Sequence, residues 1–281
     1  MSKYISIVFI AGMLSLFLSS FALAQKLKPE EIIAKHLDSI AAANVRTARK
    51  NLIAVGDVTV DYITQKNPSA TGRVVMASEG RKMFLGFSLN ASDYPMEKII
   101  YDGGRSQVDF VRPGARSDLG SFLNSNGDLL NQGLLGGTLT TAWALLNLDE
   151  LRPKLSGGGT KKIDGVECYS IGYSPRGGND LNITLYFEKD TFRHIRTEYS
   201  RVISAAIGRT IDTSARQQET RLRVVETFSD FGPVGELTLP KHYKLHYSFS
   251  GSSGIKEVSW TYKLLEFAVD QSMDPNTFAI N

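Results

Sequence analysis

The chain has 281 residues, of which 42% are hydrophobic and 22% are charged, and its formal net charge is +3 at pH 7. Its lysines and arginines are spread along the sequence, so this small positive charge gives no support for nucleic-acid binding. Cys168 is the only cysteine, which excludes an intramolecular disulfide. Since Cys168 lies within an alternating segment, we expect it to be a buried and inert thiol.

Residues 1–24 have the pattern of a secretory signal peptide. Lys3 supplies a positive n-region, an apolar run follows from Ile5 to Leu18, and Ala22-Leu23-Ala24 provides the small residues that a signal peptidase requires. We therefore expect cleavage after residue 24 and a periplasmic or secreted mature protein. The alternative is an uncleaved membrane anchor, because the run up to Ala24 is just long enough to span a bilayer.

The remaining residues, 25–281, show no strong composition shift and are predicted to form one domain. The domain begins with an amphipathic helix that is expected to end near Asn44. Pro29 suits the first turn of a helix, and the two glutamates that follow favour its positive end. The predicted buried stripe of this helix consists of Ile32, Ile33, Leu37 and Ile40.

Alternation of apolar and polar residues predicts eleven strands in the rest of the chain. They are expected at 52–63, 72–78, 81–89, 98–102, 106–111, 166–173, 182–188, 193–199, 220–231, 239–249 and 256–267. Residues 203–218 are the least patterned and are predicted to be a mobile loop. Because successive strands form hairpins with one wet and one dry face, the predicted fold class is mainly β with α. We expect a curled antiparallel sheet of about eleven strands.

The dry face carries the predicted binding chemistry. Large rings on neighbouring strands either fill a core or line a cavity for an apolar ligand, and for any one residue both interpretations stay open. For the face as a whole a cavity is favoured, because two helical segments are too few to cover eleven strands. The predicted cavity lining consists of Val58, Val60, Met76, Met83, Leu85, Phe87, Tyr243, Leu245, Tyr247 and Trp260.

A helical insert interrupts the strands at residues 117–155. It is rich in leucine, punctuated by glycine and, over residues 118–148, almost uncharged. The spacing of Leu135, Leu139, Trp143 and Leu146 predicts one helical stripe. An apolar helix laid over an open sheet would form and close an apolar pocket, so the insert is either a movable lid or ordinary core.

The patterns typical of catalysis and metal binding are not met. His242 and His246 are four residues apart, which brings two ligands together on a helix but separates them by roughly 13 Å on a strand. His36 and His194 are expected to be surface or satisfied polar residues. The run Gly157–Lys161 lacks the spacing of a phosphate loop and is predicted to be a plain loop. We therefore expect no catalytic site, no metal and no cofactor.

The order of elements resembles the periplasmic carriers and acceptors of lipoproteins (LolA/LolB-like) and the outer-membrane lipoprotein-sorting proteins. The resemblance covers nearly the whole mature chain. It is carried by IIYDGGRSQVDF (99–110), by ETFSDFGPVGELTLPKHYKL (226–245) and by MDPNTFAI (273–280). The resemblance implies an unclosed half-barrel whose concave face holds acyl chains under a helical lid.

Applied to this chain, the resemblance makes the insert the lid and Gly133, Gly136 and Gly137 its hinge. Its cavity-facing residues would be Leu130, Leu134, Leu135, Leu139, Trp143 and Leu146. One feature departs from the family. The arginine that tethers the lid in the family is replaced by Ser78, with Arg81 nearby, so a permanent plug is the alternative to a lid.

The leading hypothesis is a noncatalytic exported carrier that binds a lipid or lipoprotein acyl chain. Each buried methylene would contribute about 0.8 kcal/mol to binding, with few directional contacts. We expect a monomer that contacts the membrane transiently, with an envelope protein as a second candidate partner. The alternatives are an envelope-stress sensor or regulatory module of the same fold and a secreted hydrolase with a site built from distant residues.

Overall fold

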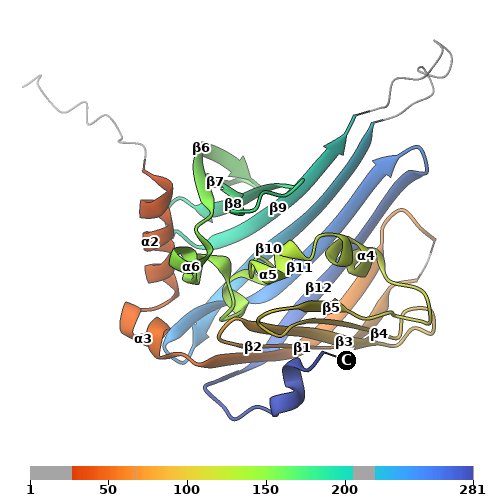
Figure 1. Ribbon diagram of the computed structural model, residues 1–281, viewed down its shortest axis with the longest axis horizontal. Coiled ribbons are helices and arrows are strands. Elements are labelled where there is room, and N and C mark those ends of the chain that lie inside the picture. Colours follow the sequence, from red (N-terminus) through yellow and green to blue (C-terminus); the bar gives the residue numbers. More distant parts are fainter. Residues whose placement is uncertain (1–26, 67, 205–218, 281) are drawn as a thin grey trace, which may run out of the picture.

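The structure is a computed structural model that describes residues 27–66, 68–204 and 219–280 (Figure 1). The predicted signal peptide lies outside the described residues, and so does most of the loop predicted at 203–218. Among the helices of the described part, none is both long and apolar enough to cross a membrane.

Twelve strands form one antiparallel sheet, because the alternating segments pair as successive hairpins. The strands are β1 (Asn51–Tyr62), β2 (Ala70–Glu79), β3 (Lys82–Leu89), β4 (Met96–Tyr101), β5 (Ser106–Val108), β6 (Lys154–Ile163), β7 (Val166–Ser174), β8 (Asn182–Glu188), β9 (His194–Ile203), β10 (Thr220–Val234), β11 (Leu237–Gly251) and β12 (Gly254–Val269). Their order is β5-β4-β3-β2-β1-β12-β11-β10-β9-β8-β7-β6. The first and last strands therefore pair inside the sheet, and β5 and β6 form its two edges.

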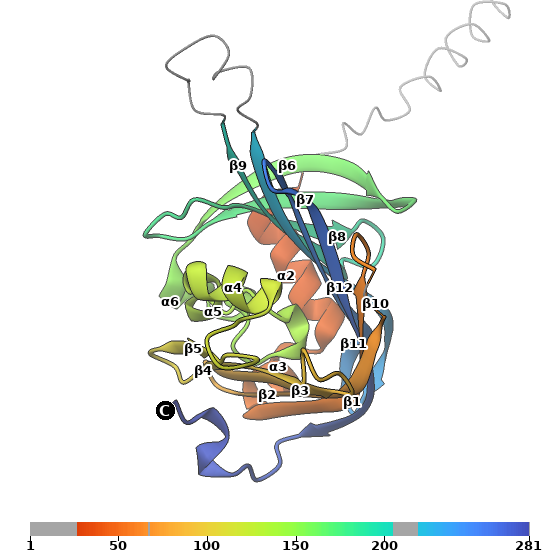
Figure 2. The ribbon, with the colours of Figure 1, turned by 90° about the vertical axis from the view of Figure 1, so that its right-hand side faces the viewer.

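The sheet curls around the N-terminal helix and the insert, as Figure 2 shows. The helices are α2 (Pro29–Ile40), α3 (Ala43–Ala48), α4 (Asp118–Ser125), α5 (Asp128–Asn131), α6 (Leu148–Leu151) and the 3-10 turns η1 (Gly137–Leu139), η2 (Ala144–Leu146) and η3 (Pro275–Phe278). The edges β5 and β6 do not pair with each other, so the barrel stays open. The predicted fold class, an unclosed half-barrel covered by a helix and a helical insert, is confirmed.

The strand register gathers the predicted apolar residues on the concave face. Trp260 pairs with Val60 of β1 and with Leu245 of β11, and Leu245 pairs with Glu226 of β10. Side chains of directly paired residues point to the same side of a sheet. All four side chains are buried. This row thus crosses the concave face and places one glutamate among apolar side chains.

The prediction of a plain loop at Gly157–Lys161 is wrong, because these residues lie in β6 and pair with β7. An edge strand is held by backbone hydrogen bonds to a single neighbour, which glycines can make as well as other residues. A bulge between Gly157 and Gly159 accommodates the extra residue. This strand accounts for the difference between the eleven strands predicted and the twelve observed.

The N-terminal helix is shorter than predicted. It ends at Ile40, the chain is extended at Ala41, and α3 starts at Ala43. Its buried face contains Ile32, Ile33 and Ile40 as expected, while Leu37 is only partly buried and His36 takes a buried place.

Candidate functional site

The concave face and the insert share one apolar cluster, which contains every residue predicted for the cavity and for the lid. All of them are buried except Tyr247 and Leu146, which are partly buried and pack against the cluster. These side chains therefore face a common interior. In this structure the insert's own side chains occupy that interior.

The insert is not the single helix that was predicted. It consists of three short helices and two 3-10 turns, because Gly133, Gly136 and Gly137 have φ angles of +68°, +81° and +50°, which interrupt a right-handed helix. At Gly133 the chain folds back so closely that a Cβ would lie 1.9 Å from the Ala142 carbonyl oxygen. The residues of the predicted stripe therefore reach the sheet from separate turns and do not share one face of a single helix.

Aromatic rings form the wall beneath the insert. Phe228, Tyr243 and Tyr262 stack across β10, β11 and β12, with centroid distances of 5.1 and 5.2 Å. The insert lies directly on this wall, because a Cβ added to Gly137 would come within 2.9 Å of the Phe228 ring. The indole of Trp143 packs against the His194 ring at a centroid distance of 5.0 Å.

Glu226 fastens the middle of the insert to this wall. It is fully buried, and its Oε1 accepts hydrogen bonds from the Gly136 backbone N–H at 2.8 Å and from the Tyr243 hydroxyl at 2.5 Å. Its Oε2 lies 2.6 Å from the Tyr199 hydroxyl, which also lies 3.1 Å from the Leu134 carbonyl oxygen. Burial raises the pKa of Glu226 to about 7, although its hydrogen bonds lower it.

The protonation state of Glu226 decides which hydrogen bonds its cluster can form. A hydroxyl has a single hydrogen, so Tyr199 cannot donate to Glu226 and to Leu134 at the same time. When the Glu226 carboxyl is protonated, it donates to the Tyr199 oxygen, and Tyr199 then donates to the Leu134 carbonyl. When the carboxyl is ionised, Tyr199 donates to it instead, and one bond to the insert is lost.

A second buried glutamate holds the start of the insert. Glu97 of β4 accepts a hydrogen bond at 2.6 Å from the hydroxyl of Ser117, the N-cap residue of α4. The Tyr94 hydroxyl also donates to Glu97 and in turn accepts a hydrogen bond from the Trp260 indole at 3.0 Å. Burial raises the pKa of Glu97 to about 7. Each half of the sheet therefore contributes one carboxyl group to the insert.

Ser78 and Arg81, which lie at or near the position of the family's tether arginine, both contact the insert. The Ser78 hydroxyl accepts a hydrogen bond from the Thr141 backbone N–H at 2.9 Å. The Arg81 guanidinium donates to the Asn131 carbonyl oxygen at 2.6 Å and forms an ion pair with Glu150 at 3.3 Å. The departure at Ser78 therefore does not leave the insert untethered, because Arg81 reaches it from the next turn.

His36 and His194 were expected at the surface or as satisfied polar residues, and this prediction is wrong. Both are buried, and each makes one hydrogen bond while its other ring nitrogen lacks a partner. Their rings lie 6.1 Å apart between α2, the insert and the sheet. Burial lowers the pKa of His36 to about 3 and that of His194 well below its ordinary value. Both imidazoles are therefore neutral at physiological pH.

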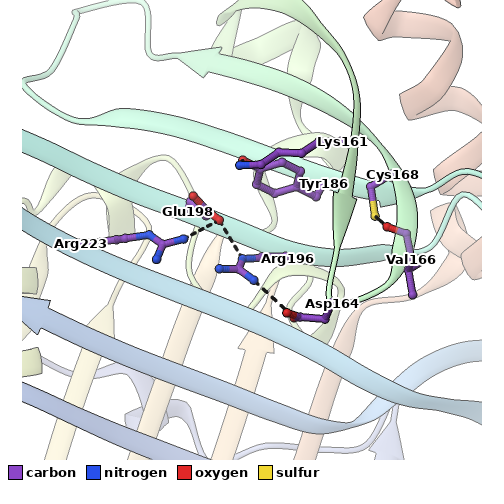
Figure 3. A network of polar contacts seen from close by, with 8 residues as sticks. All are labelled: Lys161, Asp164, Val166, Cys168, Tyr186, Arg196, Glu198 and Arg223. Atoms are coloured by element: carbon purple, nitrogen blue, oxygen red, sulfur yellow. Dashed lines mark hydrogen bonds and ion pairs between the residues drawn. The ribbon is translucent and has the colours of Figure 1, made fainter.

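Charged side chains of β9 and β10 and of the turn after β6 form a network on the side of the sheet away from the insert, as Figure 3 shows. Arg196 bridges Asp164 at 3.5 Å and Glu198 at 2.9 Å, and Arg223 pairs with Glu198 at 2.8 Å. Cys168 is buried nearby, as predicted, and burial raises the pKa of its thiol. Cys168 belongs to a small apolar cluster with Ile163 and Tyr186, so this side of the sheet carries both charged and buried apolar side chains.

The described surface cavities lie away from the predicted lining. One of about 290 Å³ lies between α5, the chain before β8 and Arg201, and two others lie beside Asp230 and beside Arg49. None of the three is lined by a predicted cavity or lid residue in the described ranges. Because the side chains of the insert belong to the same buried cluster as the concave face, a ligand on that face would have to displace them.

His242 is exposed and His246 is partly buried, where its Nδ1 lies 2.9 Å from the Ser259 hydroxyl. Within residues 27–66, 68–204 and 219–280 there is no group of three or more His, Cys, Asp or Glu side chains arranged to hold a metal ion.

The two glutamates are the residues that the sequence interpretation missed. Glu226 occupies an inward position in the alternation of Val224, Glu226 and Phe228, and Glu97 is in phase with buried Ile99. A glutamate at an apolar position of an alternating strand was the available signal. Its partners could not be read from the sequence, because they lie on other strands and on the insert.

The sequence matches no known family model and no curated protein. Several solved structures have a similar arrangement. A LolA superfamily protein from Nitrosomonas europaea is 13% identical over 90% of this chain and 98% of its own, with a TM-score of 0.49. A DUF1329 family protein from Desulfovibrio piger is 13% identical over 89% and 96%, with a TM-score of 0.46. A putative outer membrane lipoprotein-sorting protein domain from Vibrio parahaemolyticus is 11% identical over 88% and 97%, with a TM-score of 0.45.

Proposed function

We propose that this chain is an exported, noncatalytic carrier that binds a lipid or lipoprotein acyl chain on the concave face. One observation carries the proposal: an apolar insert covers the inner face of an unclosed sheet and is fastened there by a few polar contacts. An insert held mainly by apolar packing can be exchanged for an acyl chain, because both bury similar surface against the same side chains.

The binding site would form when the insert moves away from the wall. An acyl chain would then contact Leu245 and Trp260 at the centre of the sheet and Phe87 on β3, all of which are buried in the apolar cluster that also contains the insert. The polar contacts at Glu97, Glu226 and Arg81 would return the insert when the ligand leaves. The predicted transient membrane contact belongs to the loading and release of such a ligand.

Native mass spectrometry of protein purified from the cell envelope, with lipid extraction, tests this function. A copurifying amphiphile that is released by denaturation is the expected result. An interior without any amphiphile, combined with no uptake of added fatty acid, would contradict the carrier function.

Uptake of a fluorescent fatty acid locates the site. Leu139→Glu on the insert and Trp260→Glu on the wall are each expected to abolish uptake, because a charge would be buried against the chain. His242→Ala, at an exposed position of β11, should leave uptake unchanged. Equal loss in all three variants would indicate misfolding, and circular dichroism of each variant provides the check.

The second candidate is an envelope sensor or regulatory module that binds a protein. It is favoured by β6, an edge strand of mostly exposed residues whose outer backbone groups face no neighbouring strand. A partner strand could add to this edge. Capture of an extended peptide by the protein, lost on Thr160→Pro in β6 and retained without bound lipid, would favour this function over the carrier.

A further inference from the structure

Glu226 is an ionisable group at the centre of an apolar face. Its cross-strand neighbours on the same row are Thr197 and Leu245, and its exposed fraction is 0%. Burial of a carboxyl is unfavourable unless hydrogen bonds replace those lost to water. Such a group therefore has to be explained by the donors around it.

Two of its three contacts come from the sheet itself. Tyr199 and Tyr243 belong to the strands on either side of β10, so they stay beside Glu226 whether or not the insert is present. The third contact, the Gly136 backbone N–H, belongs to the insert. When the insert leaves, Glu226 Oε1 loses a donor and the Tyr199 hydroxyl loses the Leu134 acceptor.

We propose that Glu226, Tyr199 and Tyr243 form the polar end of the ligand site and bind a neutral hydrogen-bond donor, an amide N–H or a hydroxyl, carried on an apolar chain. This inference rests on the proposed carrier function and adds a ligand class to it. The insert fills the site in this structure with a donor and an acceptor of its own backbone, Gly136 N–H and Leu134 C=O.

The ligand class follows from the two groups that lose a hydrogen-bond partner when the insert leaves, the Glu226 carboxyl and the Tyr199 hydroxyl. A ligand without a donor would leave Glu226 Oε1 with the Tyr243 hydroxyl as its one remaining donor, so the hydrogen bond that Gly136 now makes would not be replaced. A secondary amide supplies both the N–H for Glu226 and a carbonyl for Tyr199, whereas a hydroxyl supplies the donor and an ester supplies only an acceptor. A neutral donor suits the site because burial raises the pKa of Glu226 to about 7, which favours the uncharged carboxyl.

Three ligands of equal chain length separate these chemistries. N-methylhexadecanamide and methyl hexadecanoate have nearly the same shape and differ in the N–H, and hexadecanol carries a hydroxyl. Their dissociation constants can be measured by displacement of a fluorescent fatty acid. The protein is expected to bind the amide more tightly than the ester. The affinity for the alcohol shows whether a hydroxyl group can replace the amide N–H as the donor.

Glu226→Met removes the acceptor at nearly constant volume. It is expected to lower the ratio of amide to ester affinity about tenfold, which corresponds to one hydrogen bond of about 1.4 kcal/mol. Glu226→Gln keeps an acceptor oxygen and should retain most of the preference. Glu198→Gln on β9 is the matched control, because Glu198 faces the convex side and pairs with Arg223.

The outcomes are distinct. Equal binding of amide, alcohol and ester by the unaltered protein would overturn the donor site and leave the carrier function intact. No binding of any of the three would contradict both. A preference for the amide that persists unchanged in folded Glu226→Met would also overturn the inference. The comparison in the unaltered protein needs no variant, so misfolding of Glu226→Met does not remove the test.

Discussion

Glu226 links protonation to the stability of the fold. Its pKa rises from an ordinary value of 4.5 to about 7 because the folded protein removes the carboxyl from water. A carboxyl whose pKa is higher in the folded than in the unfolded state stabilises the fold fully below pH 4.5. That contribution is lost as the pH rises towards 7. Glu97 shows the same direction for the same reason.

Glu226→Gln tests this linkage, because glutamine does not titrate. Between pH 4.5 and 7 the unfolding free energy of the unaltered protein should fall relative to that of the variant, by on the order of 3 kcal/mol. Urea unfolding at pH 5 and pH 7.5 measures the difference. Parallel pH profiles for the two proteins would show that the Glu226 carboxyl titrates alike in folded and unfolded chains.

At the scale of the elements, the insert is the part of the fold that we expect to open most easily. Arg81 donates a hydrogen bond to its Asn131 carbonyl and pairs with Glu150. Arg81→Ala should remove about 1 kcal/mol from the closed state, which corresponds to roughly fivefold faster amide exchange in residues 127–151. Exchange in the sheet should not change.

Arg73→Ala is the matched control for Arg81→Ala. Arg73 lies on β2, the strand that precedes the turn with Arg81, and forms an ion pair with Asp57 at 2.6 Å between two exposed side chains. Such surface pairs contribute little to stability. If both variants accelerate exchange of the insert equally, the Arg81 contact does not hold it closed.

The sequence predicted the elements better than their internal path. Alternation located eleven of the twelve strands, and the insert lies where its composition indicated. The course of the insert was not predictable, since three glycines at positive φ and a close approach at Ala142 decide it. The glycine run of β6 has no alternating side chains, so only its pairing with β7 identifies it as a strand. Glu226 was missed because its donors come from distant segments.

For the whole molecule, the buried histidines and glutamates act in opposite directions. His36 joins α2 to the insert and to the sheet, because its ring packs against Trp143 and Phe187 at 5.0 Å each. His194 lies beside it, and burial lowers the pKa of both. Between pH 6.5 and about 3, His36 binds a proton in the unfolded chain but not in the folded protein, and the lowered pKa of His194 acts in the same direction. The histidines therefore reduce stability as the pH falls, while the glutamates reduce it as the pH rises.

Below pH 4.5 protonation of the two buried glutamates no longer opposes the effect of the histidines, so the whole fold should lose stability. Each histidine contributes up to about 1.4 kcal/mol per pH unit. His36→Phe, which cannot be protonated, should flatten this acid limb in urea unfolding measured from pH 6.5 to pH 3.5. His242→Ala at the exposed position should keep it. An acid limb of unchanged slope in His36→Phe would place the proton uptake elsewhere in the molecule.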